Sequence, residues 1–263
     1  MTPEESRVAC PVTVTVITLN ASQHIRQCLE SVRWADEIVI VDSGSTDDTL
    51  TIARTFTDRI VHHDWAGYGP QKQFAVSQAQ HDWILSLDAD ESLTPELAEN
   101  TRRLLQEGPS LYAYQLRRCN QFMGHWLRHG EGYPDLVLRL FDRRHACWSD
   151  DVVHEKIIYN GHVGELAGDL LHRSENGIAA YIDKQNRYSS LQAEKLYGQG
   201  VRASVAQLLF SPTLRFIKFY FIRCGFLDGL PGLVHISIGC FNSFIKYAKL
   251  REKWMASGRA SDR

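Results

Sequence analysis

The sequence predicts an α/β protein with a mostly parallel central sheet flanked by helices, followed by a helical C-terminal region. Short β-branched runs alternate with segments of about a dozen residues that have a helical pattern, as in βαβ units. Three of these runs end in polar loops. After residue 200, basic residues are interleaved with Phe and Ile. We therefore expect residues 1–200 to form the α/β domain and residues 201–263 to form a basic, amphipathic helical region.

The composition indicates a globular chain with an anionic partner. Of 263 residues, 44% are hydrophobic and 23% are charged, so a substantial core is expected and disorder is not. Residues 201–263 contain ten Lys or Arg and three Asp or Glu, a net charge of +7, which leaves −9 for residues 1–200 within the total of −2. Phe and Ile among these basic residues favour a membrane surface over a nucleic acid.

The cysteines and the N-terminal residues predict a cytoplasmic location. The six cysteines are scattered, with no C-x-x-C pair and no zinc-like spacing, so we expect free thiols in a reducing compartment. The first residues, MTPEESRVACP, contain two acids and no apolar run typical of a secretory signal.

Two strands with polar loops begin the chain. Val12–Ile17 alternates Val with Thr, and a helix over residues 23–34 follows it. The run over residues 37–41 is continuous and β-branched, as expected for a strand buried on both faces, and a helix over residues 49–57 follows. The loop residues expected to contact a ligand are Thr18, Leu19, Asn20, Asp42 and Gly44.

The next repeat carries a lysine and an acidic loop. A short strand over residues 59–62 precedes a helix over residues 70–79, and Trp83–Leu87 forms the fourth strand. Lys72 follows a glycine-rich turn and is expected to meet a phosphate, with a surface lysine on an amphipathic helix as the alternative. Asp88 and Ala89 are expected to contact the ligand beside the fourth strand.

Three carboxylates directly after this strand suggest a metal. Asp88, Asp90 and Glu91 repel one another, and a divalent cation relieves such repulsion; Mg²⁺ and Mn²⁺ prefer oxygen ligands together with substrate phosphates. Ligands also gather at the carboxyl ends of strands in α/β sheets. We assign Asp90 as the metal ligand and Glu91 as a residue that orients its neighbours. The alternative is a solvated turn that caps the helix over residues 95–106.

These motifs resemble a known family. VTVTVITLNAS, EIVIVDSGSTDDT and WILSLDADE, in this order and spacing, resemble the inverting glycosyltransferases of family 2, which have the GT-A fold. The resemblance implies a nucleotide-diphosphate sugar as donor and a divalent metal, Mg²⁺ or Mn²⁺, held by Asp90. The sequence has no G-x-G-x-x-G or P-loop motif, which argues against dinucleotide binding and P-loop phosphoryl transfer.

An inverting transfer needs a carboxylate that takes a proton from the acceptor hydroxyl. After strands over residues 112–116 and 137–141, Glu155 follows Val152-Val153 at an expected strand end, and its V-H-E triplet resembles one branch of the family. Asp151 is the second candidate base and Asp135 the third. The alternative for Glu155 is an exposed strand residue paired with Lys156.

A histidine and two aromatic residues are also assigned. His172 is expected to close the metal sphere, as late histidines do in some GT-A enzymes, or else to be structural. Trp126 and Tyr133 are expected to stack on sugar rings or to belong to the core.

The C-terminal region predicts membrane contact. After a helix over residues 178–197, the segment Thr213–Arg223 is basic and amphipathic, and Gly229–Ile245 has no charge over seventeen residues. We expect a re-entrant or interfacial hairpin in Gly229–Ile245, since it is short for a membrane span and contains a proline. The alternative is a soluble helical subdomain that packs on the catalytic domain or on a second subunit, so a homo-oligomer stays open.

The segments GFLDGLPGL, YPDLVLRLF and VHE also resemble the lipopolysaccharide-core glucosyltransferases of the WaaE/KdtX type. This implies transfer of a β-linked glucose from UDP-glucose to an inner-core heptose of a lipid A-anchored acceptor. It also implies a peripheral location on the cytosolic face of a bacterial inner membrane. The alternatives are a family 2 enzyme of another cell-surface glycan or glycolipid and a membrane-bound carbohydrate-binding or scaffold protein.

Overall fold

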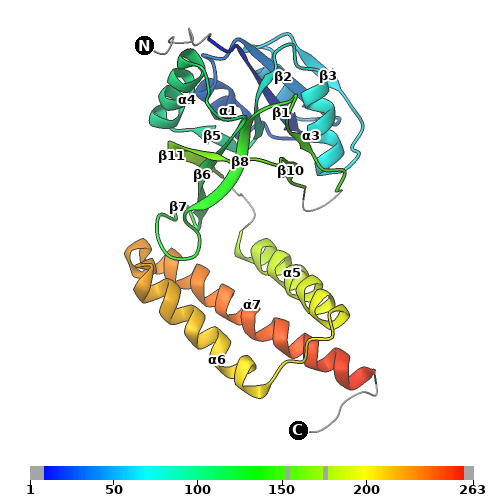
Figure 1. The fold of residues 1–263 in the computed structure, drawn as a ribbon, viewed down its shortest axis with the longest axis vertical. Helices are drawn as coiled ribbons and strands as arrows, with labels where there is room; N and C mark the ends of the chain where they lie inside the picture. The colour runs from blue at the N-terminus through cyan, green and yellow to red at the C-terminus, as the bar shows by residue number, and fades with distance from the viewer. Residues whose placement is uncertain (1–8, 152–154, 174–176, 258–263) are drawn as a thin grey trace, which may run out of the picture. The chain divides into compact units, whose positions relative to one another are not determined.

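The computed structural model describes residues 9–151, 155–173 and 177–257, which divide into two compact units (Figure 1). The α/β unit comprises residues 1–118 and 135–173, and the helical unit comprises residues 119–134 and 174–263. The α/β unit thus ends at residue 173, whereas the expected α/β domain extended to residue 200. The helix over residues 178–197, expected in the α/β domain, belongs to the helical unit.

The first half of the sheet is parallel, as predicted. It contains β1 (Val12–Thr18), β2 (Glu37–Asp42), β3 (Ile60–His62) and β4 (Trp83–Asp88), in the order β3-β2-β1-β4. The connecting helices are α1 (Ile25–Ser31), α2 (Thr49–Ala53) and α3 (Tyr68–Ser77). Every residue of β1 and β2 is buried, in keeping with their β-branched sequences. Parallel pairing brings the ends of β1, β2 and β4 to one edge of the sheet.

The second half of the sheet contains antiparallel pairs. It continues from β4 through β8 (Asp135–Asp142), β6 (Ala113–Phe122) and β11 (Gly164–His172) to β5 (Glu91–Leu93). Helix α4 (Pro95–Glu107) begins at the predicted proline, and the Thr94 hydroxyl caps it by accepting a hydrogen bond from Leu97 N. A separate hairpin joins β9 (Cys147–Trp148) and β10 (Ile157–Ile158). The expected strand end at Val152-Val153 lies outside the described residues.

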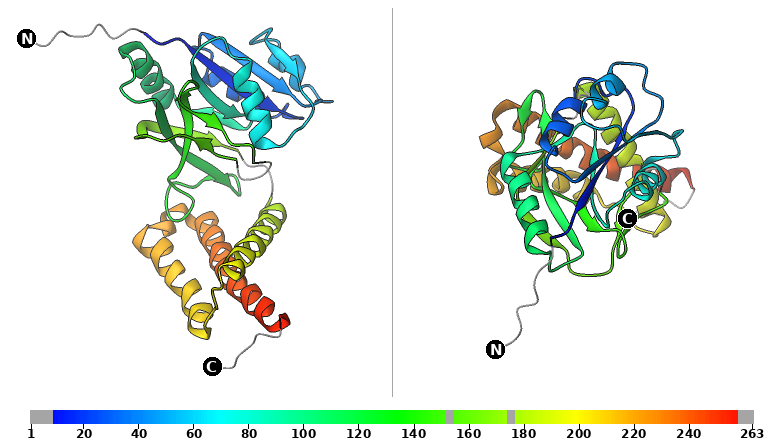
Figure 2. Two further views of the ribbon diagram at one scale, coloured as in Figure 1. Left: turned by 45° about the vertical axis from the view of Figure 1, so that its right-hand side comes forward. Right: turned by 90° about the horizontal axis from the view of Figure 1, so that it is seen from above.

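The helical unit is a layer of three helices in which α7 lies between the other two (Figures 1 and 2). Its helices are α5 (Ile178–Gly198), α6 (Val205–Phe216) and α7 (Gly229–Ala256). A π-helical turn η1 (Ile217–Ile222) and a 3-10 turn η2 (Gly225–Asp228) join α6 to α7. The short strand β7 (His125–Trp126) pairs with the end of β6.

The predicted hairpin within Gly229–Ile245 is wrong, because this segment is helical throughout. Pro231 does not break α7, since it lies in the first turn, where a missing N–H removes no helical hydrogen bond. The chain reverses earlier, between η1 and η2. Among the described residues, no single helix is long and apolar enough to cross a membrane; the pair Val205–Ile222 and Gly225–Ala256, bent by 76°, qualifies only when taken together.

Candidate functional site

The loops after β1 and β2 are hydrogen-bonded to each other. Asn20 has a left-handed backbone (φ 50°), which Asn tolerates better than most residues. Its N–H donates to Ser45 Oγ (2.9 Å), and its Oδ1 accepts from Thr46 N (2.8 Å). Asp42 Oδ2 accepts from the N–H groups of Gly44 and Ser45, both at 2.9 Å. The predicted residues Asn20, Asp42 and Gly44 therefore lie in one loop cluster at the carboxyl edge of the sheet.

Thr18 and Leu19 differ in their surroundings. Leu19 is exposed, whereas Thr18 is buried at the end of β1, and no described residue forms a hydrogen bond with its hydroxyl. A buried hydroxyl without a partner is costly. A polar group of a bound ligand would supply the missing hydrogen bond.

The acidic loop after β4 is neutralised in part by the protein itself. Arg139 Nη2, on β8, lies 2.9 Å from Asp88 Oδ2 and 2.9 Å from Glu91 Oε1. Burial alone would lower the pKa of Arg139, but Glu91 and Asp88 raise it above its ordinary value. The repulsion that suggested a metal for all three carboxylates is thus relieved at two of them by an arginine. Glu91 is fully buried, and its Oε2 accepts from Asp88 N (3.1 Å), which fits its predicted orienting role.

Lys72 on α3 is a fully buried cation between two carboxylates. Its Nζ lies 2.9 Å from Asp88 Oδ1 and 2.9 Å from Glu155 Oε1, and it stands over the Trp148 ring, 4.7 Å from the centroid. The alternative of a surface lysine is therefore wrong. A phosphate contact by Lys72 would compete with these two carboxylates.

The position of Glu155 depends on close packing between α3 and the segment that joins β9 to β10. Gly69 N donates to Asp151 O (3.2 Å), and a Cβ at Gly69 would lie 2.1 Å from Ser149 O. Trp148 N donates to Gln73 Oε1 (2.8 Å). These contacts hold the segment so that Glu155 meets Lys72 and, through it, Asp88. The alternative in which Glu155 pairs with Lys156 is not what the structure shows.

The other two candidate bases lie in different surroundings. Asp151 is exposed, and its backbone carbonyl accepts the hydrogen bond from Gly69. Asp135 Oδ2 lies 2.6 Å from Arg118 Nη2, with which it forms an ion pair. Of the three candidates, Glu155 is the one that the lysine joins to the acidic loop.

Asp90 and His172, the two predicted metal ligands, lie side by side. His172 Nε2 is 3.3 Å from Asp90 Oδ2, because β11 pairs with β5 in a register that places His172 opposite Glu91. Among the described residues, no group of three His, Cys, Asp or Glu side chains is arranged to hold a metal. An Asp oxygen and an imidazole nitrogen nevertheless suit Mn²⁺ or a similar cation that takes further ligands from water and phosphate.

The charge around Asp90 also suits a cation. Burial raises the pKa of the Cys28 thiol well above its ordinary value, and the carboxylates of Glu91, Asp90 and Asp88 raise it further. The carboxylates of the acidic loop therefore place negative charge near Cys28.

Sequence reasoning missed the two arginines of the site. Arg139 stands within the apolar strand LVLRLF, and Arg118 follows another apolar stretch and pairs with both Asp135 and Glu91. A charged residue inside an apolar strand rarely lacks a partner. This signal would have indicated a buried ion pair, although not its partner. Trp126 and Tyr133, the expected sugar-stacking residues, belong to the helical unit.

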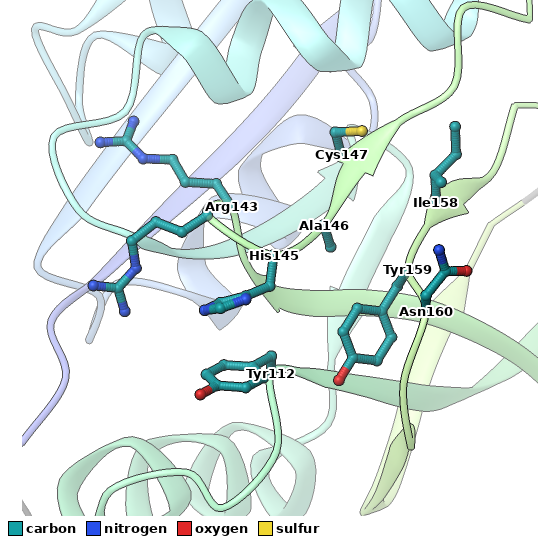
Figure 3. A pocket seen from close by; sticks show the side chains of 9 residues that line it. Tyr112, Arg143, His145, Ala146, Cys147, Ile158, Tyr159 and Asn160 are labelled. Carbon is teal, nitrogen blue, oxygen red and sulfur yellow. The ribbon is translucent and has the colours of Figure 1, made fainter.

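Figure 3 shows a pocket that contains none of the predicted site residues. It is lined by residues around Arg143, His145 and Tyr159. Arg143 and Arg144 contact Asp82, which precedes β4, whereas Asp88 ends that strand. Because these arginines already have acidic partners, we assign the pocket no ligand.

Comparisons with known proteins identify the family. The model of "Glycosyl transferase family 2" matches residues 13–158. The lipopolysaccharide core biosynthesis glycosyltransferase LpsC of Rhizobium meliloti is 31% identical over 256 residues, 95% of each chain. An uncharacterized glycosyltransferase of Rickettsia typhi is 32% identical over 253 residues, 92% of this chain and 87% of that one.

Similarity to solved structures is more distant. The crystal structure of S. aureus TarS 1-349 shares 14% identity and aligns with a TM-score of 0.45 over 96% of this chain and 93% of that one. A likeness of this size does not inform on ligands. The family model, in contrast, covers more than half of the chain and includes both loop motifs, the acidic loop and Glu155. The protein belongs to glycosyl transferase family 2, and its mixed α/β architecture is that of the GT-A fold.

Proposed function

We propose that this glycosyltransferase is metal-dependent and inverting, and that it moves glucose from UDP-glucose to an inner-core heptose of lipopolysaccharide, forming a β-glycosidic bond. The observation that carries the proposal is the meeting of Glu155, Lys72 and Asp88 beside the loops that end β1 and β2. The R. meliloti relative is a lipopolysaccharide core biosynthesis glycosyltransferase, which supports the acceptor class. The donor sugar and the bond rest on the resemblance of sequence motifs.

The chemistry is a single displacement in which Glu155 is the general base. As the acceptor oxygen forms its bond to the anomeric carbon, its proton moves to the Glu155 carboxylate. The bond between the anomeric carbon and the diphosphate breaks, and UDP leaves with the electron pair. Attack from the face opposite to the leaving group inverts the anomeric centre.

Lys72 acts as a positioning residue in this proposal. Its ammonium group holds the Glu155 carboxylate at 2.9 Å and is itself fixed by Asp88 and the ring of Trp148. Glu155 comes from a loop segment, and a carboxylate on such a segment needs a fixed partner to remain in a reactive geometry. Arg139 fixes Asp88 and Glu91 in the same way from the other side.

Asp90 and His172 would hold the divalent cation, Mg²⁺ or Mn²⁺. When bound, such a cation neutralises charge that develops on a departing diphosphate. The donor itself would be held by the loop cluster, where carbonyl, hydroxyl and carboxylate oxygens are available to a base and a ribose. The donor-binding residues we propose are Thr18, Leu19, Asn20, Asp42, Gly44, Asp88 and Ala89.

The acceptor in this proposal is anchored in a membrane through lipid A. We therefore place the enzyme on the cytosolic face of a bacterial inner membrane. The net charge of +7 over residues 201–263 supports contact with anionic lipid.

The test is UDP release and sugar transfer over a panel of nucleotide sugars, with Mg²⁺, Mn²⁺ or EDTA. We expect UDP-glucose to be the preferred donor and EDTA to abolish turnover. Absence of metal-dependent UDP release from every donor would contradict the proposal. Transfer to a different glycan, with no transfer to a heptose-bearing core, would favour the alternative of another cell-surface glycan.

A further inference from the structure

The helical unit places polar side chains between its helices. Tyr181 of α5 shares a hydrogen bond with His235 of α7 (OH to Nε2, 2.8 Å). Asn242 Nδ2 donates to Gln185 Oε1 (2.9 Å), again between α7 and α5. Between α6 and the loop before β8, Arg215 forms an ion pair with Glu131. Hydrogen bonds and charges therefore occupy positions that a water-soluble helical layer normally fills with Leu and Ile.

Small residues allow close packing on α5 and α7. The buried residues of α5 are Ser189 and Ala193, and three of the five in α7 are Gly232, Gly239 and Ser243. A Cβ at Gly232 would lie 2.5 Å from Gly225 O, and one at Gly239 would lie 2.5 Å from Glu131 Oε2. Ser243 shares a hydrogen bond with Ser211 of α6 (2.5 Å). Small residues and side-chain hydrogen bonds at helix contacts are typical of helices packed in lipid.

Large apolar side chains lie on the outside of the same unit. None of the residues of α6, all of them described, is buried. From α6 through η1 and η2 to the start of α7, ten large apolar side chains are between 43% and 72% exposed; we call six of them, beginning at Leu214, the apolar surface. The six are Leu214, Ile217, Phe221, Ile222, Leu227 and Leu230.

We propose that the apolar surface inserts into the acyl layer of a lipid bilayer, with α6 and the start of α7 lying in the plane of the interface and not crossing it. Polar groups in lipid must find their partners inside the protein, whereas apolar side chains face outward without cost. The helical unit has both properties. Insertion of this kind is typically about 5–10 Å deep.

Charge next to the apolar surface fits the same partner. Lys218 and Arg223 are exposed within the stretch that carries the six apolar side chains, and Asp228 in that stretch is buried. Lysine and arginine at such positions extend to head-group phosphates while their stems lie along the apolar region. The partner is therefore a bilayer that contains anionic lipid. A second protein covering this surface would not require the polar contacts between helices.

The proposal deepens the membrane location proposed above and rests on it, but it is independent of the transfer chemistry. Purified protein is mixed with vesicles of phosphatidylethanolamine and phosphatidylglycerol and floated through a density gradient at low and high salt. Salt at 1 M shortens the Debye length to about 3 Å, so purely electrostatic binding is lost. We expect the protein to float with the vesicles under both conditions.

A triple variant tests which side chains insert. Leu214→Gln, Phe221→Gln and Ile222→Gln together should lower the partition coefficient at high salt by roughly a factor of ten or more for each side chain removed. The matched control is Leu191→Gln with Met255→Gln, which changes two exposed apolar side chains outside the apolar surface and should leave partitioning within about twofold. Circular dichroism should show equal helix content in all three proteins.

Three outcomes would overturn the proposal. The first is release of the wild-type protein from vesicles by high salt, and the second is equal flotation of the triple variant and the wild type. The third is a wild-type protein that does not float but self-associates, when the triple variant does not self-associate. The last result would show that a second copy covers the apolar surface. Sugar transfer to a soluble, deacylated acceptor distinguishes the two proposals. The triple variant should retain this transfer. If the wild-type protein binds vesicles but transfers no sugar, the proposed function is contradicted and the membrane proposal is not.

Discussion

In the α/β unit the fully buried side chains are mainly Leu, Ile and Val, and the buried charges include Lys72, Glu91 and Arg139 around the acidic loop. In the helical unit, hydrogen-bonded polar groups and small residues lie between helices, and large apolar side chains face outward. The first arrangement gains stability from burial in water. The second is what a lipid solvent favours. The difference is the basis of our proposal that the helical unit contacts lipid.

Charged pairs also differ between the two units. In the α/β unit, Lys72 and Arg139 hold carboxylates at the place where a nucleotide sugar is proposed to bind. In the helical unit, Arg215 and Glu131 join helix α6 to a loop. Because we propose that the first set serves the reaction, whereas the second joins a helix to a loop, variants in the two sets should give different readouts.

The largest expected effect comes from the α/β unit. Glu155→Gln removes the proposed base but keeps an oxygen that can accept a hydrogen bond from Lys72, so sugar transfer should fall by about 10²–10⁴-fold. UDP affinity, measured by calorimetry, should change little. Full activity in this variant would move the role of base to Asp151 or Asp135.

Loss of a buried cation should be the next largest effect. Lys72→Met leaves Asp88 and Glu155 without their shared partner, and we expect unfolding of the α/β unit to become easier by about 3–5 kcal/mol. The control, Lys184→Met on an exposed position of α5, should change stability by less than about 0.5 kcal/mol. Lys72→Arg should restore part of kcat at unchanged KM. If Lys72→Met matched the wild type in urea unfolding and kcat, the ion-pair account would be wrong.

Truncating leucines would test the opposed placement of apolar side chains. Leu85 of β4 is fully buried, and Leu85→Ala should destabilise the protein by about 2–5 kcal/mol. Leu214 of α6 is 64% exposed, and Leu214→Ala should cost less than about 0.5 kcal/mol in aqueous buffer. If both variants lost equal stability in thermal unfolding, Leu214 would be buried in solution, and the contrast between the two units would be wrong.

Close packing at Gly69 should affect catalysis more than stability. A methyl group there would meet the backbone oxygen of Ser149 at 2.1 Å and must displace the segment that carries Glu155. A shift of about 1 Å can lower a rate by about 10²-fold, so Gly69→Ala should reduce kcat by up to this factor. Gly198→Ala, where nothing lies within 4 Å of the added carbon, is the control and should be neutral. Unchanged kcat in Gly69→Ala would mean that the segment adapts freely.

The smallest effect should be a pH dependence of the helical unit. Burial lowers the pKa of His235. The charge of Arg215 lowers it further, whereas the charges of Glu131 and Asp228 raise it. Tyr181 and Phe122 pack against the imidazole ring. Because the folded pKa lies below the unfolded one, this histidine stabilises the unit above the unfolded pKa. That contribution is lost as the pH falls towards and through the folded value. Urea unfolding between about pH 7 and pH 5 should show this loss, and His235→Phe should reduce it.

Local patterns predicted the elements that depend on local sequence. The continuous β-branched runs of β1 and β2 and the Thr94-Pro95 start of α4 were readable because propensity and burial agree there. Strands β9 and β10 have two residues each, too short for any periodicity. The hairpin expected in Gly229–Ile245 failed because glycine and proline at a helix start look like a turn in sequence.

The sequence indicated which residues could belong to the site, but not which of them contact one another. Asp90 and His172 are 82 positions apart and meet because of strand register, which sequence does not display. Lys72 was expected at a phosphate, but its contacts with Asp88 and Glu155 depend on how α3 packs against the β9–β10 segment. Arg139 went unnoticed, although an arginine within an apolar strand implies a buried partner.

The most direct test of the central claim is the configuration of the product. UDP-glucose, a divalent cation and a heptose-bearing core acceptor are incubated with the enzyme, and the new linkage is determined by NMR. The account predicts a β-linked glucose that forms with the wild type and is lost with Glu155→Gln. An α-linked product, or equal product from the variant, would contradict a single displacement that uses Glu155 as the base.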